Sequence, residues 1–190
     1  MITIINSWTD PYVNLACEEY VFNHFQEDDV FLLWRNKPSV IVGKNRNTLA
    51  EVDLEYIRTH QIPVVRRLSG GGAVFHDLGN LNFTFITSDA GGAFNDFRRY
   101  TQPIIDALEK MGVTATFSGR NDLVIDGKKF SGNAQYKKKD RVLHHGTLLF
   151  ASEIEDLSSV LKPRQSKFEG KGVQSVVSRV TNISSHLDTP

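Results

Sequence analysis

Hydrophobic and polar positions along the chain follow two periods, one typical of strands and one typical of helices. The helical period follows Thr9 and Asp10, either of which can cap a helix whose apolar stripe ends at Phe25. The helical period occurs again over residues 97–111, and Gly112 after it is a residue that commonly ends a helix. Shorter helices are expected over residues 54–60 and 154–161. Short apolar or alternating segments predict strands at residues 2–6, 30–34, 39–42, 73–75, 81–86, 114–118, 123–125, 128–131 and 142–150.

Turn signals separate these segments. Asp126-Gly127 is a strong two-residue hairpin signal, and further turns are expected at residues 36–38, 77–80 and 137–140. The pattern predicts an α+β domain in which a mixed, largely antiparallel sheet carries packed helices. Residues 164–190 are polar and weakly patterned, so this end of the chain is interpreted as cut rather than finished.

Composition and charge narrow the classes of protein that fit the pattern. A chain of 190 residues, 40% hydrophobic and 23% charged, is ordinary for one folded domain. Its formal net charge of +0 argues against a broad basic face, so no nucleic-acid partner is expected. Cys17 is the single cysteine, which excludes an intramolecular disulfide and is typical of a reducing compartment. Without a signal peptide or a run of about 20 apolar residues, we expect a cytoplasmic protein with no membrane partner.

The stretch "RRLSGGGAVFHD", residues 66–77, is the first candidate for chemistry. It lacks the lysine and hydroxyl residues of a P-loop, and the strand predicted after it differs from the helix of a dinucleotide-binding fingerprint. One interpretation is a glycine-rich turn. The other is a backbone cradle whose N–H groups bind an anion beside a guanidinium group. Because Arg66 and Arg67 alternate along a strand, one would enter the site and the other would point away, which favours the cradle.

A second candidate is "GRNDLVIDGKKFSGNAQY", residues 119–136. In a regular strand after the hairpin turn, Lys128 shares one face with Phe130. Lys129 shares the opposite face with Ser131, so only one of the two lysines can enter a site. A lysine is most often a solvated surface charge, but glycine and amide residues close to this pair favour a site.

Two further polar pairs accompany these segments. Asn121 and Asp122 are candidates to orient a nucleotide or a hydrated Mg²⁺, which commonly uses one or two carboxylates. His144 and His145 lie in "LHHGTLLF", and adjacent strand residues point to opposite faces. We therefore expect one histidine to line a cavity and the other to be structural or exposed. No cysteine or carboxylate has zinc-like spacing to them, so a structural zinc is not expected.

Together these segments resemble the lipoate–protein ligase A family. The matching stretches follow the family's order and are "NLACEEYVF" (14–22), "LLWRNKPSVIVGKNRN" (32–47), "RRLSGGGAVFHDLGNLNFTF" (66–85), "GRNDLVIDGKKFSGNAQY" (119–136), "HHGTLLF" (144–150) and "KGVQSVVSRVTN" (171–182). The resemblance implies the biotin/lipoate ligase catalytic fold, which is related to the class II aminoacyl-tRNA synthetase core. It implies that residues 1–190 are a catalytic domain truncated at the C-terminus, without the family's accessory domain or with a separate accessory protein.

The resemblance also implies a reaction in two steps. Lipoate or octanoate reacts with ATP, together with Mg²⁺, to give the acyl-adenylate and pyrophosphate. A lysine of an acceptor lipoyl domain then attacks the adenylate, which forms an amide and releases AMP. The implied acceptors are the lipoyl domains of 2-oxoacid dehydrogenase E2 subunits and the glycine cleavage H protein.

Site residues follow from the matching motifs. Lys129 would contact both the lipoyl carboxyl oxygen and the α-phosphate, and would offset the repulsion between two anions. Arg67 would contact the nucleotide phosphates, and Asp122 would hold Mg²⁺. The other positions implied to bind ATP are Gly72, Ala73, Val74, Phe75 and Asn121. The other residues implied to bind lipoate are Arg66, Gly71, His76 and His145.

Two rival functions stay open. An ATP-independent octanoyl or lipoyl transferase of the same fold would use a cysteine thioester, but Cys17 lies in the predicted N-terminal helix and is interpreted as a core thiol. Ser69 precedes glycines but lies outside a Gly-x-Ser-x-Gly elbow, so nucleophilic catalysis has weak support. The second rival is a lipoate- or nucleotide-binding module without turnover.

Overall fold

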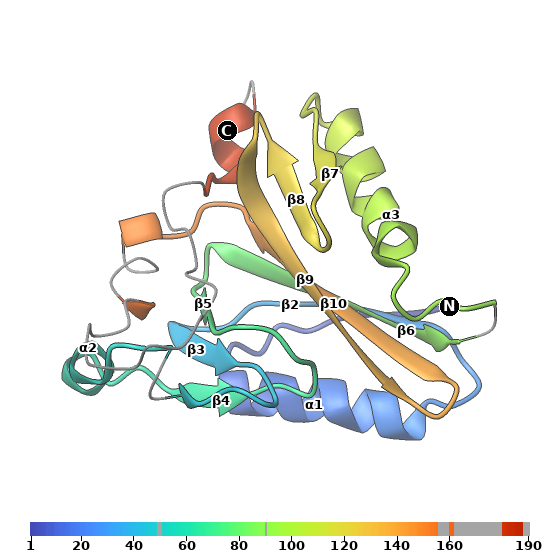
Figure 1. The fold of residues 1–190 in the computed structure, drawn as a ribbon, viewed down its shortest axis with the longest axis horizontal. Coiled ribbons are helices and arrows are strands. Elements are labelled where there is room, and N and C mark those ends of the chain that lie inside the picture. The colour runs from blue at the N-terminus through green and yellow to red at the C-terminus, as the bar shows by residue number, and fades with distance from the viewer. Residues whose placement is uncertain (49–50, 90, 156–159, 162–179, 188–190) are drawn as a thin grey trace.

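The computed structural model describes residues 1–48, 51–89, 91–155, 160–161 and 180–187. Its main feature is a seven-stranded sheet with the order β1-β2-β6-β10-β9-β8-β7 (Figure 1). The strands are β1 (Ile2–Ile5), β2 (Val30–Trp34), β6 (Asn80–Ser88), β7 (Thr116–Ser118), β8 (Asp122–Ile125), β9 (Lys128–Lys138) and β10 (Arg141–Leu149). β1 and β2 pair in parallel and the other neighbours are antiparallel, which confirms the predicted mixed, largely antiparallel sheet.

A second sheet of three strands carries the glycine-rich stretch. Its order is β4-β3-β5, with β3 (Ser39–Val42) in the centre, β4 (Val64–Arg66) parallel to it and β5 (Val74–His76) antiparallel. The stretch between β4 and β5 therefore connects two outer strands across the central one. β5 is an edge strand within the described part of the chain, so the backbone on its outer side pairs with no other strand there.

Each α-helix with described bounds begins after an aspartate. The helices are α1 (Pro11–His24), α2 (Leu54–Thr59) and α3 (Phe97–Lys110). The carboxylates of Asp10, Asp53 and Asp96 accept hydrogen bonds from N–H groups in the first turns, which otherwise lack partners. Asp10, and not Thr9, is therefore the cap of the first helix.

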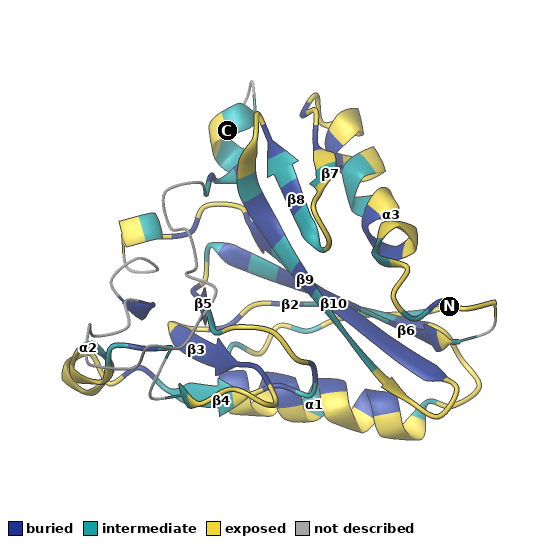
Figure 2. Ribbon diagram, viewed as in Figure 1, coloured by how far each residue is buried: buried dark blue, intermediate teal, exposed yellow. Residues whose placement is uncertain are grey.

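The two faces of the main sheet bury separate hydrophobic clusters. Figure 2 shows buried positions along the central strands and on α1 and α3. One packs α1 against the sheet and consists of Leu15, Val21, Phe22, Val30, Leu32, Trp34, Ile41, Ile86 and Leu143. The other packs α3 against the opposite face and consists of Phe83, Leu108, Val113, Ala115, Leu123, Ile125, Phe130, Leu148 and Ile183. Because successive side chains of a central strand point to opposite faces, they pack alternately toward α1 and toward α3.

Some predicted boundaries differ from the structure. β9 continues to Lys138, whereas its strand was predicted to end at residue 131, because the polar part from Asn133 onward pairs with β10. The helix predicted over 154–161 falls partly outside the described residues, as does most of the polar segment 164–190. A 3₁₀ helix, η3 (Ile183–His186), lies in the described part of that segment. Across the described residues, no helix is both long enough and apolar enough to cross a membrane.

Candidate active site

Close backbone contact fixes the glycine loop, defined here as residues 67–73. A Cβ added to Gly43, which follows β3, would lie 2.0 Å from the carbonyl oxygen of Gly71. Gly71 has a φ of 99°, in a region that favours glycine. The Lys44 N–H donates to the Ser69 carbonyl at 2.9 Å. The glycines therefore allow two loops of the protein to approach each other, which the sequence alone did not indicate.

Arg67 holds the glycine loop from inside. Its guanidinium donates to the carbonyls of Gly70 and Gly72 at 2.7 and 2.9 Å. It also donates to the Ser69 hydroxyl at 3.0 Å and to the Ile41 carbonyl at 3.1 Å. Burial lowers the pKa of Arg67 to about 10, so the group stays charged at neutral pH. Its predicted contact with nucleotide phosphates stays a prediction.

Arg66 lies on the other side of the same strand end. It is exposed, and its guanidinium donates to the carbonyls of Gly43, Lys44 and Arg46 at 2.7, 3.2 and 3.1 Å. A fourth bond reaches the Thr48 hydroxyl at 3.2 Å. Arg67 is buried and Arg66 is exposed, so the two side chains differ in burial, and which of them enters a site stays a prediction. Arg66 braces the loop after β3, and its assignment to lipoate stays a prediction.

A buried relay links the glycine loop to α1. Ser69 Oγ lies 2.6 Å from His145 Nε2, and His145 Nδ1 lies 2.9 Å from Glu18 Oε1. The Thr84 hydroxyl donates to the same Glu18 oxygen at 2.6 Å. Burial alone would raise the pKa of Glu18, but His145 and Thr84 outweigh it and leave that pKa below its ordinary value. Glu18 is therefore a buried carboxylate with two donors.

The two adjacent histidines face opposite layers, as predicted. His145 meets Glu18 of α1, whereas the ring of His144 stacks on Tyr100 of α3 with ring centroids 4.7 Å apart. His144 also bonds Gln135 at 3.0 Å, and burial lowers its pKa to about 3. His145 is thus the histidine on the side of the glycine loop, and His144 is a neutral core residue.

His76 is buried with a fixed tautomer. Asn14 Nδ2 donates to Asn36 Oδ1 at 2.8 Å, which identifies the oxygen of the Asn36 amide. The other amide atom, Asn36 Nδ2, can only donate, so it donates to His76 Nδ1 at 3.1 Å. The ring proton is therefore on Nε2, which has no partner among the described residues. Burial, and then the charges of Arg67 and His145, lower the pKa of His76 to about 3.

A β-bulge decides where Lys129 lies. Leu123 of β8 pairs with Ser131. The next residue of β8, Val124, pairs with Lys129, which leaves Phe130 as an extra residue. Because adjacent residues of β8 face opposite sides, Lys129 and Ser131 lie on opposite faces. The prediction that these two share a face was therefore wrong, since it assumed a regular strand.

The bulge brings Lys129 next to Asp122. Lys129 Nζ lies 2.8 Å from Asp122 Oδ1, with the side chains 42% and 36% exposed. The lysine chain lies across Gly132, where an added Cβ would be 3.0 Å from Nζ. Asn121 bonds within the sheet instead, because its side-chain amide donates to the Asn133 carbonyl at 2.6 Å. Lys129 and Asp122 are thus the accessible charged pair of this hairpin.

The predicted nucleotide-binding backbone lies at the end of the glycine loop. Ala73 N–H donates to Glu51 Oε2 at 2.6 Å, and Arg46 Nε lies 3.5 Å from Glu51 Oε1. Val74 and Phe75 follow in β5, whose outer edge has no strand partner in the described part. An internal carboxylate thus bonds the loop N–H that was assigned to ATP.

Glu18 and Glu51 were missed as site residues. Glu51 gives no signal, because only folding brings it to Ala73. Glu18 does give one, since it falls on the buried stripe of α1 between Leu15 and Phe22. A carboxylate in such a stripe requires a buried partner.

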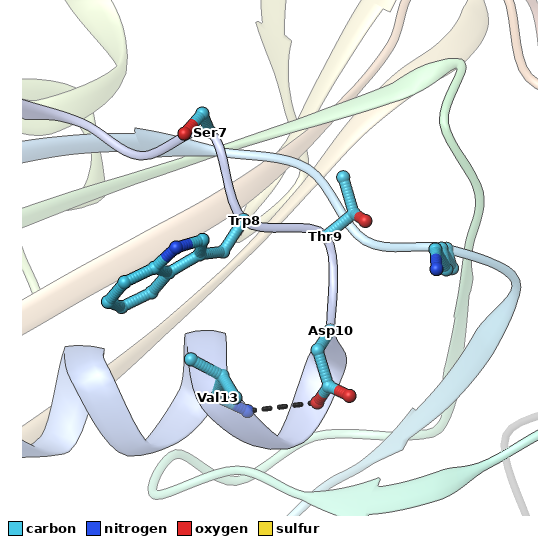
Figure 3. A pocket seen from close by; sticks show the side chains of 6 residues that line it. Ser7, Trp8, Thr9, Asp10 and Val13 are labelled. Carbon is cyan, nitrogen blue, oxygen red and sulfur yellow. Dashed lines mark hydrogen bonds between the residues drawn. The ribbon is translucent and has the colours of Figure 1, made fainter.

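Two pockets open near α1. One of about 500 Å³ lies at the start of the helix and is lined by Ser7, Trp8, Thr9, Asp10, Val13 and Lys37 (Figure 3). It contains none of the predicted site residues. A smaller pocket of about 180 Å³ has Glu18, Arg66 and Arg67 in its lining. The relay and the arginines therefore adjoin the smaller pocket.

The chain is similar to known proteins along most of its length. A family model described as "Lipoyl protein ligase A/B catalytic domain" matches residues 10–190. The chain is 53% identical over 180 residues to the lipoate-protein ligase LplJ of Bacillus subtilis, covering 94% of this chain and 54% of that protein. It is 50% identical over 186 residues to lipoate–protein ligase 1 of Staphylococcus aureus, covering 97% and 57%.

Solved structures resemble the fold over its whole length. LipL1 of P. falciparum in complex with lipoate matches with a TM-score of 0.87 and 30% identity, covering 100% of this chain and 57% of that one. A bi-partite lipoate protein ligase of Thermoplasma acidophilum, described with its E2 lipoyl domain, gives 0.88 and 30%, covering 100% and 76%. A lipoate-protein ligase A bound with ATP gives 0.82 and 26%, covering 100% and 79%. These matches confirm the predicted fold class.

The chain spans about half the length of the curated relatives it matches, 54% and 57%. The match to the family model nevertheless covers residues 10–190, and both relatives are at least 50% identical. The resemblance found in the sequence is thereby confirmed, and the chain belongs to the lipoyl protein ligase A/B catalytic domain family.

Proposed function

We propose that the chain activates lipoate, or octanoate, with ATP to form the acyl-adenylate, and transfers the acyl group to a lysine of a protein acceptor. The observation that carries the proposal is the accessible Lys129–Asp122 pair in a chain 53% identical to a lipoate-protein ligase. Relatives of the same fold with bound lipoate and with bound ATP support both substrates. Residues 1–190 act as one catalytic domain in this proposal.

Lys129 provides the electrostatic part of the first step. A lipoate carboxylate oxygen bonds to the α-phosphorus of ATP as the bond to pyrophosphate breaks, so two anions must approach each other. A cation between carboxylate and phosphate stabilises the charge that develops, without acting as a base or forming a covalent bond. Asp122 fixes the Nζ of Lys129, and the Thr181 N–H bonds the Lys129 carbonyl at 2.9 Å.

The nucleotide is assigned to the glycine loop and to the edge of β5. Arg67 keeps the loop in one conformation and adds positive charge there. The backbone of residues 72–75 would hold the nucleotide, and Asn121 would lie close to it. Because Glu51 bonds the Ala73 N–H, nucleotide binding at that N–H requires Glu51 to release it.

Asp122 is the proposed Mg²⁺ contact. Its carboxylate is 36% exposed and is the kind of single carboxylate with which Mg²⁺ is often held. When bound, Mg²⁺ neutralises part of the phosphate charge. His76, His145, Arg66 and Gly71 are retained as the proposed lipoate contacts.

The acceptor class is a lipoyl domain, which the archaeal ligase described with its E2 lipoyl domain supports. We propose E2 subunits of 2-oxoacid dehydrogenases and the glycine cleavage H protein as the specific acceptors, in the cytoplasm. A thioester route through Cys17 is disfavoured, because burial, and then Glu18, raise the pKa of this thiol.

Exchange of labelled pyrophosphate into ATP tests the proposal. Lipoate, octanoate and biotin are compared as substrates, and labelled lipoate is then offered with an apo-lipoyl domain. Lipoate-dependent exchange and labelling of the acceptor lysine are expected. Acyl transfer without ATP would favour the transferase, and binding without exchange would favour a module without turnover.

A further inference from the structure

We propose that Glu18 is a positioning residue that acts through His145 and Ser69 to hold the glycine loop in one conformation. The three residues come from α1, β10 and the loop itself, so no two are neighbours in sequence. The contacts are short, 2.9 Å from Glu18 to His145 and 2.6 Å from His145 to Ser69. Their exposed fractions are 1%, 9% and 1%.

With Glu18 ionised and the His145 ring neutral, the hydrogen bonds of this relay run in one direction. A carboxylate accepts only, so His145 Nδ1 carries a proton and donates to it. In the neutral ring, Nε2 must then accept from the Ser69 hydroxyl. The same Ser69 oxygen accepts from Arg67 Nε at 3.0 Å. The orientation of the serine hydroxyl is thereby fixed at both its donor and its acceptor side.

The end of the relay is the loop backbone. The guanidinium that donates to Ser69 also donates to the Gly70 and Gly72 carbonyls, at 2.7 and 2.9 Å. If His145 Nε2 no longer accepts the hydrogen bond from Ser69, the Ser69 hydroxyl can turn to the Gly70 carbonyl, which lies 3.5 Å away. That turn would compete with Arg67 for the same carbonyl. The state of Glu18 is thus transmitted over two side chains to the loop.

Loss of the Glu18 charge should weaken this relay, because the other titratable groups around His145 are the Arg67 cation and two histidines whose pKa values are about 3. Arg67 Nε and His145 Nε2 both bond the Ser69 hydroxyl, His76 interacts electrostatically with His145, and His144 is its neighbour in β10. Glu18 is the carboxylate that bonds to His145 among the described residues. Glu18→Gln keeps the shape and an acceptor oxygen but removes the charge, so it weakens the relay without leaving a cavity.

Amide hydrogen exchange tests the relay without any ligand. The probes are the N–H groups of Lys44 and Ala73, which bond to Ser69 and Glu51 at the two ends of the loop. In Glu18→Gln and in Ser69→Ala, both amides should exchange about tenfold faster, which corresponds to about 1.4 kcal/mol. Glu19→Gln, at the exposed neighbour of Glu18, should exchange like the wild type.

A double-mutant cycle separates a relay from independent structural roles. In a relay, Glu18→Gln combined with Ser69→Ala should exchange no faster than the faster single variant. The proposal would be overturned if the two increases in exchange rate multiply in the double variant. It would also be overturned if Ser69→Ala folds and its amides exchange at the wild-type rate. Ser69→Ala keeps the Glu18–His145 bond, so it decides the question if Glu18→Gln does not fold.

The link to catalysis rests on the proposed function. In pyrophosphate exchange, both single variants should raise the KM for ATP or lipoate several-fold with little change in kcat. A fall in kcat at unchanged KM would contradict positioning of a binding loop. Because amide exchange needs no substrate, an inactive wild type would refute the proposed function and leave the relay testable.

Discussion

Replacing Lys129 by alanine should abolish pyrophosphate exchange while the protein stays folded. The ion pair to Asp122 joins side chains that are 42% and 36% exposed, and such pairs contribute about 0–1 kcal/mol to stability. The bond from the Thr181 N–H uses the Lys129 carbonyl and is retained. In the reaction, loss of a fixed group beside the developing charge costs about 3–4 kcal/mol, or roughly 10²–10³-fold in kcat.

The assay is lipoate-dependent pyrophosphate exchange at saturating ATP, with urea unfolding measured in parallel. Lys128→Ala is the matched control, because this neighbouring lysine is exposed and the bulge directs Lys129, not Lys128, to Asp122. A folded Lys129→Ala with near-normal exchange would refute the assignment. Equal losses in both variants would mean that the charge of the hairpin matters and the position of Lys129 does not.

Three further predictions concern packing, protonation and the cysteine. Gly43→Ala should lower the free energy of unfolding by about 1–3 kcal/mol, because its Cβ would lie 2.0 Å from a backbone oxygen. Gly70→Ala should change the free energy of unfolding far less, because a Cβ at position 70 faces open space. Equal urea midpoints for the two variants would contradict the close contact between Gly43 and Gly71. Stability should fall from about pH 6.5 toward 3, because His76 and His144 have folded pKa values of about 3 and the unfolded chain binds more protons in that window. Each contributes up to about 1.4 kcal/mol per pH unit, so His144→Gln should flatten the pH dependence of the urea midpoint, and an unchanged slope would contradict its burial. Cys17→Ser should keep wild-type pyrophosphate exchange and acyl transfer, and loss of acyl transfer alone would revive the thioester route.

Local sequence rules predicted most elements because their causes are local. The cap at Asp10, the end of a helix at Gly112 and the Asp126-Gly127 turn all depend on residues within a few positions of each other. Position 126 has a φ of 50° and position 127 a φ of 74°, as a two-residue hairpin turn of this kind requires. Strand alternation likewise separated His144 from His145.

The candidate site was predictable only in part. The glycine loop and Lys129 were found from their motifs, whereas Glu51 and the relay from Glu18 depend on contacts between distant segments. The bulge at Phe130 was missed because an extra residue in one strand becomes visible only when its partner strand is known. That single residue changes which side chains share a face with Lys129.

By itself, the sequence determined the α+β class, the positions of most strands and helices, and the residue types available for binding an anion. Propensity, capping and turn chemistry act over a few residues, so a single sequence reveals them. The tertiary structure decided what the glycines contact, where Lys129 points and how Glu18 reaches the loop. Those features depend on strand register and on buried hydrogen bonds between segments far apart in the chain, and neither is fixed until the sheets and α1 pack together.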